Sequence, residues 1–457
     1  MQQIIPPISL VEKILGQQKT NEGATYRLTA HCMRIERPEG VLLYHTLTGE
    51  LLLLSYDEAD LLGTLPGSVP QALAGLVSRR FLVPAEADDM VLADQVRDIA
   101  RRLKREDGSL TEYLVFTTTA CNARCFYCFE AGIKKATMSE KTARAAGKYI
   151  AEHCGGKPVR LVWFGGEPLV NVKAIDTISD VLRQRGVEFS SRMDSNGYLF
   201  DEALAQRAKD DWRLDEVQIT LDGTEEIYNQ RKAFVNPEGS PFQRVLRNIG
   251  MLLDADVPVH VRLNMDDDNE QDLYVLVNEL AERFGEKSGF GIALRVIIEN
   301  KGSQPHIYTE EARNSLAEKA RAMWAYLDRK GVAVRRSLND GVVLYSCWSD
   351  KTYAATITPD GRLGRCESHI DRALWGSVFS DKRNEQVLCQ WRERRPAKEI
   401  CRTCELYPRC VRLKNCVNHM EYCSPIEREE MRIRLGRAIL GAYEERKAGD
   451  PARTDSV

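Results

Sequence analysis

The sequence predicts an α/β protein: a partial (β/α)6 TIM-like barrel, preceded by a winged-helix-like module and followed by a cysteine-rich domain. Three observations carry this prediction. Six apolar segments alternate with helical patterns through the middle of the chain, which is typical of parallel βα units. Two apolar runs near the start flank a Thr-Gly pair, as in a β-hairpin. Apart from the isolated Cys389, seven of the 13 cysteines fall between residues 347 and 423.

The composition is that of a chain with several globular domains. Its 457 residues suffice for about two to four domains. With 43% hydrophobic and 29% charged residues, it can bury sizeable cores. A net charge of -3 and a pI of about 6.3 give no reason to expect a nucleic-acid or membrane-surface partner. No stretch has the features of a secretion signal or a membrane span, so we expect a soluble cytoplasmic protein.

Residues 1–108 form the first predicted domain. A β-hairpin is expected around Thr48-Gly49, followed by short helices near 56–62 and 68–84. Leu73, Leu76 and Val77 share one helical face, and the pattern over 91–106 predicts a linking helix. A hairpin with short helices indicates a winged-helix-like module. The alternative is a generic α+β lobe that only packs on the rest of the chain.

The second predicted domain, 109–340, holds the alternating strands and helices. Because right-handed crossovers build a barrel from such units, the carboxyl ends of the strands should meet at one rim. The predicted strands are 112–119, 159–166, 189–196, 216–223, 259–266 and 292–300, and the predicted helices are 139–154, 174–186, 201–212, 242–255 and 270–285.

The third predicted domain, 341–440, is poor in regular pattern and rich in cysteine. Such a segment buries little apolar surface by itself, so we expect it to need metal to fold. A helix is expected from about 425 to 446. The polar residues at the end of the chain led us to place a flexible tail at 441–457.

Cys121, Cys125 and Cys128 follow the first predicted barrel strand with the spacing C-x3-C-x2-C. A structural zinc site uses four ligands, and a disulfide uses two cysteines. Three thiolates would leave one coordination position open on the group that they hold. Clustered cysteines in a cytoplasmic chain indicate metal or iron–sulfur ligation, because structural disulfides are rare there.

The segment CNARCFYC resembles the cysteine signature of the radical S-adenosylmethionine (radical SAM) enzymes. The resemblance implies that the three cysteines hold three irons of a [4Fe–4S] cluster, while S-adenosylmethionine chelates the fourth. It also implies a 5′-deoxyadenosyl radical that abstracts hydrogen from the substrate. FGGEP and SNG match further family motifs at the ends of the next two strands. The cofactor-binding residues that the resemblance implies are Tyr127, Gly165, Gly166, Glu167, Ser195, Asn196 and Arg262.

TLDG, residues 220–223, followed by Arg231, resembles the signature of the peptide-modifying branch of the family. Tyr228 stands where the family usually has histidine. Several of these residues also have structural interpretations: Glu167 as a helix cap, the SNG segment as a turn, and Arg262 as a strand surface residue. No catalytic base is identified from the sequence.

The cysteine-rich region resembles the SPASM extension of radical SAM enzymes, which carries two auxiliary [4Fe–4S] clusters. By position, the first cluster would be held by Cys347, Cys366 and Cys416, and its fourth ligand would be Cys389, a non-cysteine side chain or substrate. The spacing also allows a pair of zinc ribbons. The second cluster would be held by Cys401, Cys404, Cys410 and Cys423.

Radical SAM–SPASM enzymes that mature ribosomally made peptides often begin with a winged-helix module, which binds the precursor's leader as an added strand. The resemblance therefore implies a precursor peptide and an electron donor such as flavodoxin or ferredoxin as partners. Thioether formation between a cysteine sulfur and a carbon is the expected reaction. The alternatives are a carbon–carbon or carbon–oxygen crosslink, epimerisation and formylglycine formation in a sulfatase. Outside catalysis, an iron–sulfur sensor or a zinc-dependent binding protein is the alternative.

Overall fold

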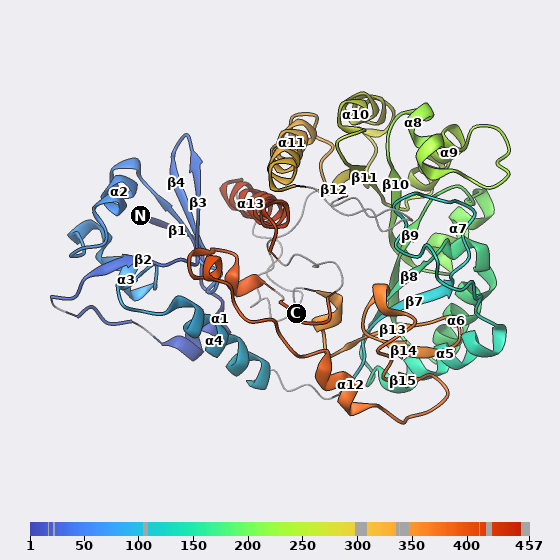
Figure 1. Cartoon of the computed structure of the whole chain (residues 1–457), viewed down its shortest axis with the longest axis horizontal. Helices are drawn as coiled ribbons and strands as arrows, with labels where there is room; N and C mark the ends of the chain where they lie inside the picture. The colour runs from blue at the N-terminus through green and yellow to red at the C-terminus, as the bar shows by residue number, and fades with distance from the viewer. Residues whose placement is uncertain are drawn as a thin grey trace.

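The computed structural model describes residues 1–16, 18–21, 23–103, 108–297, 309–334, 338, 347–410, 412–416 and 423–448. Figure 1 shows the N-terminal module on one side and the barrel on the other, with the helix α13, Pro425–Lys447, between them. The predicted α/β class with a partial barrel is confirmed. The expected boundary at 340 lies outside the described residues.

The barrel is built on a curved sheet whose strands follow the order β12-β11-β10-β9-β8-β7. All neighbouring pairs in this run are parallel. All six predicted strands are present, and the described part of the last one ends before 298. Their bounds are β7 Glu112–Thr118, β8 Val159–Gly165, β9 Phe189–Ser195, β10 Leu214–Leu221, β11 Val259–Met265 and β12 Phe290–Val296.

Helices cover the outer face of this sheet (Figure 1). Several begin at a side-chain cap: Ser139 accepts a hydrogen bond from Thr142 N, and Asp201 accepts one from Leu204 N. The helices α8 and α11 were not expected from the sequence. The bounds are α5 Glu140–His153, α6 Val172–Gln184, α7 Glu202–Asp210, α8 Glu225–Lys232, α9 Pro241–Asp254, α10 Glu270–Phe284 and α11 Glu310–Arg329.

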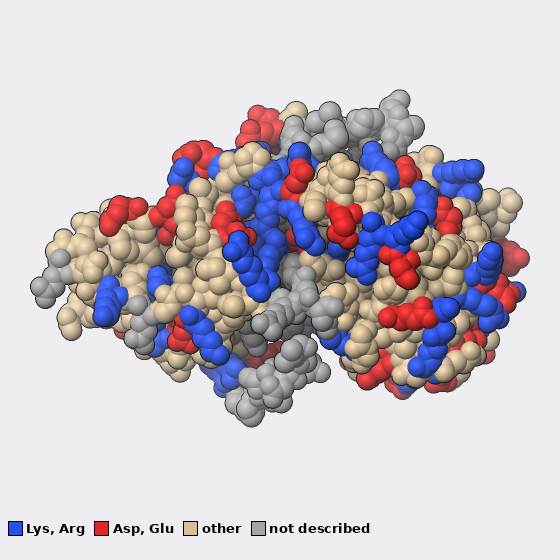
Figure 2. Space-filling model, turned by 90° about the horizontal axis from the view of Figure 1, so that it is seen from below, with Lys and Arg blue, Asp and Glu red and all other residues tan. Residues whose placement is uncertain are grey.

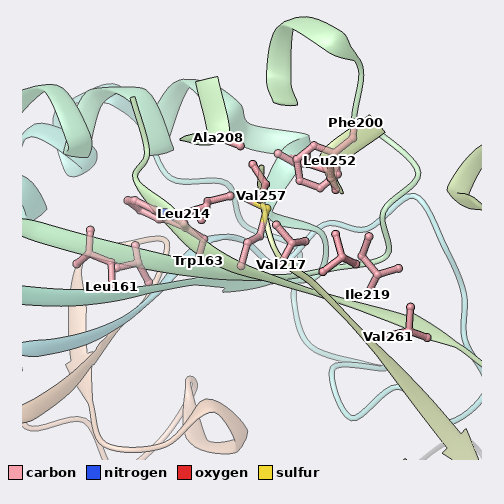
Figure 3. Packing of buried hydrophobic residues seen from close by; sticks show 14 of the residues in the cluster. Leu161, Trp163, Phe200, Ala208, Leu214, Val217, Ile219, Leu252, Val257 and Val261 are labelled. Atoms are coloured by element: carbon pink, nitrogen blue, oxygen red, sulfur yellow. The ribbon is translucent and has the colours of Figure 1, made fainter. Parts of the chain in front are cut away.

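A single apolar core joins the sheet to these helices. Figure 3 shows strand residues such as Trp163, Val217 and Ile219 meeting Leu252 and Phe200 from the covering layer. Trp163, Val217, Ile219 and Leu252 are fully buried. Because parallel strands are covered by helices, their apolar runs are nearly continuous, which is why the sequence revealed all six.

The cysteine-rich region extends the barrel sheet instead of forming a separate body. Its strand β13 pairs in parallel with β7, and β14 and β15 follow in antiparallel order. The sequence did not predict this pairing. The described elements here are short: β13 Ala354–Ile357, β14 Arg362–Gly364, β15 Gly376–Ser377, α12 Glu385–Gln390 and the 3₁₀ turns Trp348–Asp350, Glu367–His369, Glu399–Thr403 and Tyr407–Arg409.

The N-terminal module contains a four-stranded sheet with the order β1-β5-β4-β3, and β2 pairs with β6. The expected hairpin is the β4–β5 pair, joined at Thr48-Gly49. The linking helix α4 starts two residues earlier than expected, because the Asp88 carboxylate accepts hydrogen bonds from Met90 N and Val91 N. The bounds are β1 Gln2–Ile5, α1 Ser9–Leu15, β2 Tyr26–Leu28, β3 Cys32–Arg37, β4 Gly40–His45, β5 Leu51–Leu54, α2 Tyr56–Leu61, the 3₁₀ turns Leu62–Thr64 and Gln71–Leu73, α3 Ala74–Ser78, β6 Leu82–Pro84 and α4 Asp89–Leu103.

The helix α13 confirms the helix expected from about 425 to 446 and corrects the flexible tail placed at 441–457. Residues 441–447 are helical, and Tyr443 packs in a buried cluster with the sheet of the N-terminal module. The Tyr443 hydroxyl donates to the Glu39 carboxylate at 2.7 Å, and Lys447 Nζ lies 2.9 Å from the same oxygen. Docking on the module therefore orders this segment. Residues 449–457 lie outside the described residues.

The surface carries both signs of charge. Figure 2 shows acidic and basic side chains interspersed over the barrel, with Lys and Arg gathered in a band between the module and the barrel. Among the described residues, no helix has the length and apolar character needed to cross a membrane.

Candidate active site at the carboxyl rim of the barrel

The loop after β7 carries Cys121, Cys125 and Cys128, and hydrogen bonds close both of its ends. Thr119 Oγ1 donates to Lys134 O at 2.9 Å and accepts from Ala136 N at 2.8 Å. The loop also docks on the end of α8, where Arg124 N donates to Lys232 O at 2.9 Å. The three cysteines are therefore held together on the rim by contacts of the Thr119 hydroxyl and of the loop backbone.

The thiols of this loop are shielded from solvent and close enough to influence one another. Burial raises the pKa of Cys121 to about 12, and Glu167, Cys125 and Cys128 raise it further. Burial also raises the pKa of Cys128. Three mutually repelling thiolates need a bound cation to persist at neutral pH. This donor set fits an iron–sulfur cluster, whose irons are ligated by thiolates.

Gly165 and Gly166 allow the end of β8 to lie against the base of the cysteine loop. A Cβ on Gly165 would meet Thr118 O at 2.1 Å, and a Cβ on Gly166 would meet Ala120 O at 2.4 Å. Gly165 also has φ = +134°, a conformation that favours glycine. These contacts bring the second motif within reach of the first.

Glu167 links the second rim loop to the third. Its carboxylate accepts hydrogen bonds from Ser195 Oγ at 2.9 Å, Asn196 N at 2.7 Å and Leu169 N at 3.1 Å. The bond from Leu169 N caps the 3₁₀ turn Pro168–Asn171, so the capping interpretation of Glu167 is correct. Burial raises the pKa of Glu167 to about 7. A carboxylate has about four acceptor positions, so one remains for a ligand's amino group.

Asn196 completes the contact between the rim loops. Its Nδ2 donates to Asn122 Oδ1 at 2.7 Å and lies 3.9 Å from Cys121 Sγ. The sequence prediction that the ends of β7, β8 and β9 converge is therefore correct. It places Ser195 and Asn196 beside the cysteine loop.

Tyr127 belongs to a buried polar set that the sequence did not reveal. Its hydroxyl donates to Asp222 Oδ2 at 2.6 Å and accepts from Lys232 Nζ at 2.5 Å. Lys232 and Asp222 also form a fully buried ion pair at 3.2 Å. Asp222 directly follows β10, and Lys232 is the last residue of α8. The sequence signals for this polar set were therefore the acidic residue of the TLDG motif and a basic residue a short distance after it. Tyr228 is buried against Phe234 and Phe242, and Lys232 Nζ lies 5.9 Å from the centroid of its ring.

A cavity of about 480 Å³ opens beside these loops. Arg262 lies in its wall, with its Nε donating to Asn264 Oδ1 at 3.0 Å. Burial lowers the pKa of Arg262, and neighbouring Arg295 lowers it further. Three regions of the chain share the cavity: the barrel contributes Tyr127, Phe129, Phe164, Arg192, Asp194, Gln218, Arg262, Asn264 and residues 293–297, the cysteine-rich region Glu367 and Ser368, and α13 Glu427 and Arg434.

Residues 115–280, which include the cysteine loop and the three converging motifs, match the family model of the radical SAM superfamily. These residues form a radical SAM domain. The chain is accordingly an enzyme, with a [4Fe–4S] cluster and S-adenosylmethionine as its cofactors. This assignment decides against the sensor and zinc-dependent binding protein that the sequence left open.

Two further comparisons extend over more of this radical SAM chain. It is 22% identical over 332 residues to a cysteine-type anaerobic sulfatase-maturating enzyme of Clostridium novyi (strain NT), covering 66% of this chain and 87% of that protein. Native anSMEcpe with bound AdoMet and Cp18Cys peptide has a TM-score of 0.54 at 17% identity, over 73% of this chain and 99% of that chain. Native anSMEcpe with bound AdoMet gives 0.54 at 16% identity, over 72% and 99%. These structural matches establish a shared fold.

Seven further cysteines of this radical SAM enzyme fall into two groups, and members of each group influence one another's pKa. Burial raises the pKa of Cys347, and Glu367 and Cys416 raise it further. Cys366, whose pKa burial raises to about 12, is also influenced by Glu367 and Cys347. Cys347 thus lies near both Cys366 and Cys416, and their ligation of one cluster stays a prediction.

The second group is Cys401, Cys404, Cys410 and Cys423. Burial raises the pKa of Cys404 to about 11, with further increases from Glu405, Cys423 and Cys410. Burial likewise raises the pKa of Cys423, which also senses Cys410 and Cys401. Among the described residues, no three His, Cys, Asp or Glu side chains converge closely enough to ligate one metal ion.

Proposed function

We propose that this radical SAM enzyme binds a ribosomally made precursor peptide and installs a thioether between a cysteine sulfur and a carbon of another residue. The observation that carries the proposal is the shared cavity. Its wall combines the radical SAM rim, the segment after Cys366 and the helix α13. A substrate in this cavity would contact the cysteine loop, the two residues that follow Cys366 and a helix docked on the N-terminal module.

When bound, the cluster and S-adenosylmethionine supply a 5′-deoxyadenosyl radical that removes one hydrogen atom from the peptide. Glu167, oriented by Ser195 and Asn196, would hold the amino group of S-adenosylmethionine. The Arg262 guanidinium would receive its carboxylate, and Tyr127, fixed by Asp222 and Lys232, would pack near its adenine. The buried rim would also keep water from the reacting carbon.

Closing the thioether bond removes a second hydrogen from the peptide, as the proton of the cysteine thiol and one electron. The electron needs an acceptor. Cys347, Cys366 and Cys416 are three ligands for an auxiliary [4Fe–4S] cluster next to the cavity, and an open fourth position would suit the substrate sulfur. The second group of four cysteines would hold a closed auxiliary cluster.

The N-terminal module offers an edge for the leader. In its sheet order, β3 lies at one end, so its outer edge has no strand partner within the described residues. An extended leader could add there as a strand. Met33 and Ile35 of β3 pack in the same cluster as Leu435 and Ile439 of α13. A peptide leaving β3 could therefore follow α13 to the cavity.

Mass spectrometry tests the proposal. The precursor peptide encoded beside the gene is co-expressed anaerobically with the enzyme and weighed before and after thiol alkylation. Loss of two hydrogens per link, with a cysteine that no longer alkylates, supports the thioether. The same loss with every cysteine still alkylated would replace it by a carbon–carbon or carbon–oxygen link. An unchanged mass would count against crosslinking and leave epimerisation, which amino-acid stereochemical analysis detects.

Formylglycine formation is the second candidate. The similarity to a cysteine-type anaerobic sulfatase-maturating enzyme favours it. About a quarter of this chain has no counterpart in native anSMEcpe with its peptide, a share similar in size to the N-terminal module. A sulfatase peptide carrying the target cysteine discriminates the two candidates. Its conversion to an aldehyde that reacts with a hydrazide, without any change in the precursor peptide, would decide for formylglycine.

A further inference from the structure

Four arginines meet in the interface between the N-terminal module and the cysteine-rich region. Arg97 and Arg101 come from α4, and Arg394 and Arg412 come from the segment that carries the auxiliary cysteines. Arg97 and Arg412 are buried, whereas Arg394 and Arg101 are mostly shielded. We call these four residues the interface arginines. None of them lines the cavity, so the radical SAM site does not account for them.

The interface arginines are anchored in segments that carry both auxiliary cysteine groups. Arg97 donates hydrogen bonds to Tyr407 O at 3.2 Å and Pro408 O at 2.5 Å, between Cys404 and Cys410. Arg101 pairs at 2.7 Å with Asp350, whose N–H bonds Cys347 O. Arg97 thus contacts the backbone between two cysteines of the second auxiliary group. Arg101 contacts a carboxylate three residues from Cys347 of the first auxiliary group.

Two aspartates pair with the interface arginines among the described residues. Asp94 lies 3.4 Å from Arg97 and 3.0 Å from Arg412, and Asp350 lies 2.7 Å from Arg101 and 3.9 Å from Arg394. The arginines also repel one another. Burial lowers the pKa of Arg97 to about 10, and Arg394, Arg412 and Arg101 lower it further.

Gathering like charges away from water is costly unless an opposite charge lies nearby. Arg412 even adopts φ = +49°, a strained conformation for a non-glycine residue, while its guanidinium stacks 4.5 Å from the Tyr407 ring centroid. A [4Fe–4S] cluster held by thiolates is an anion, and a nearby positive charge favours its reduced, more negative form. Two such anions beside these arginines would add opposite charge to the interface.

We propose that the interface arginines are the counter-charge for the two auxiliary clusters and raise their reduction potentials, so that these clusters accept the electron released by the peptide. This inference rests on the proposed function, because it requires both auxiliary clusters. Since Arg97 and Arg101 belong to α4, the N-terminal module contributes to electron transfer as well as to peptide binding. The interface arginines are positioning residues and do not touch the substrate.

The test is a redox titration of the reconstituted full chain, followed by electron paramagnetic resonance. A unit charge roughly 10 Å from a cluster, at an effective dielectric constant of about 20, changes a one-electron equilibrium by roughly tenfold, which is about 59 mV. Arg97→Gln and Arg394→Gln should each move an auxiliary potential to more negative values by a shift of that order. Arg97→Lys, which keeps the charge, should restore most of it.

Asp94→Asn provides a test of sign. It removes a negative charge from the same interface and should shift the auxiliary potential to more positive values. A folding defect shared by the variants would not produce shifts of opposite sign. Arg283→Gln, which breaks an exposed ion pair with Glu279 on α10, is the matched control and should leave every potential unchanged.

Two results would overturn the inference in distinguishable ways. If iron and sulfide analysis shows three clusters in each variant but the auxiliary potentials equal those of the wild type, the counter-charge role is wrong and the proposed function stands. If the wild-type chain holds iron and sulfide for a single cluster, the auxiliary clusters of the proposed function are wrong, and the inference fails with them.

Discussion

The barrel and the cysteine-rich region belong to one sheet but are stabilised differently. The barrel contributes strands of seven or eight residues and helices whose apolar faces meet in one core. The cysteine-rich region joins that sheet through β13, yet its longest described element before α13 is the six-residue α12. We therefore expect the barrel to fold on apolar burial, and the cysteine-rich region to depend in addition on the bonds between cysteine and metal.

The largest expected effect separates the two cysteine regions by function. Cys125→Ala should abolish cleavage of S-adenosylmethionine, because the cluster in the rim loop loses one of its three ligands. The measurement is 5′-deoxyadenosine formed under dithionite, with Cys32→Ala as a control outside both regions. Cleavage at the wild-type rate by Cys125→Ala would remove the rim loop from the cofactor site.

Removal of iron should next separate the regions by stability. After chelation under reducing conditions, amide hydrogens between 347 and 423 should exchange much faster, because the bonds between cysteine and metal that link its short elements are lost. Those of β7 to β12 should keep their protection. Hydrogen exchange measured by mass spectrometry checks this. Equal protection of both regions with and without iron would show that the cysteine-rich region folds without metal.

A substitution in the barrel core should destabilise the barrel and leave the metal clusters in place. Leu252→Ala on α9 removes a fully buried side chain and should lower the free energy of unfolding of the barrel by about 2–5 kcal/mol. Cluster content should be unchanged under native conditions. Denaturant unfolding measures the loss, and a decrease below about 0.5 kcal/mol would mean that the core rearranges around the gap.

The smallest expected effect concerns Glu167 and pH. Because burial raises its pKa from the usual value of 4.5 to about 7, the folded chain retains a proton that the unfolded chain releases. The resulting stability is fully present below pH 4.5 and is lost as the pH rises through 7. Without S-adenosylmethionine, the wild type should therefore lose roughly 1–3 kcal/mol of its free energy of unfolding as the pH rises. Glu167→Gln should not show this loss.

Unfolding of the wild type, Glu167→Gln and the exposed control Glu152→Gln at pH 5 and pH 8 measures this difference. The wild type should lose more stability between pH 5 and pH 8 than Glu167→Gln does. Equal changes in the two chains would show that Glu167 is ionised normally in the folded state.

The sequence revealed the barrel because its signals are local. Apolar runs of strand length, such as the one containing Leu161 and Trp163, predicted the strands. The polar motifs directly after these runs predicted the rim. Gly165 and Gly166 could be assigned to the cofactor site from their motif, but their close approach to Thr118 and Ala120 could not, since it depends on a neighbouring strand.

Long-range contacts explain what the sequence did not reveal. The β13–β7 pairing joins residues more than two hundred positions apart, and the pairing partner of a short strand leaves no periodic pattern. The Tyr127–Asp222–Lys232 set and the interface arginines likewise gather charged residues from separate elements. The flexible tail was assigned from composition, whereas its helical part is ordered by Glu39 in the distant module.

The docking of α13 sets a length requirement for the precursor peptide. The helix meets Met33 and Ile35 of β3 at Gly436, and Glu427 near its start lines the cavity. The nine residues between them, at about 1.5 Å per residue, span roughly 14 Å. An extended peptide advances about 3.3 Å per residue. If the leader binds at β3 and the chain follows α13, about four residues must separate the last leader contact from the first modified position. Precursors with a shorter spacer would hold their leader in place without reaching the radical.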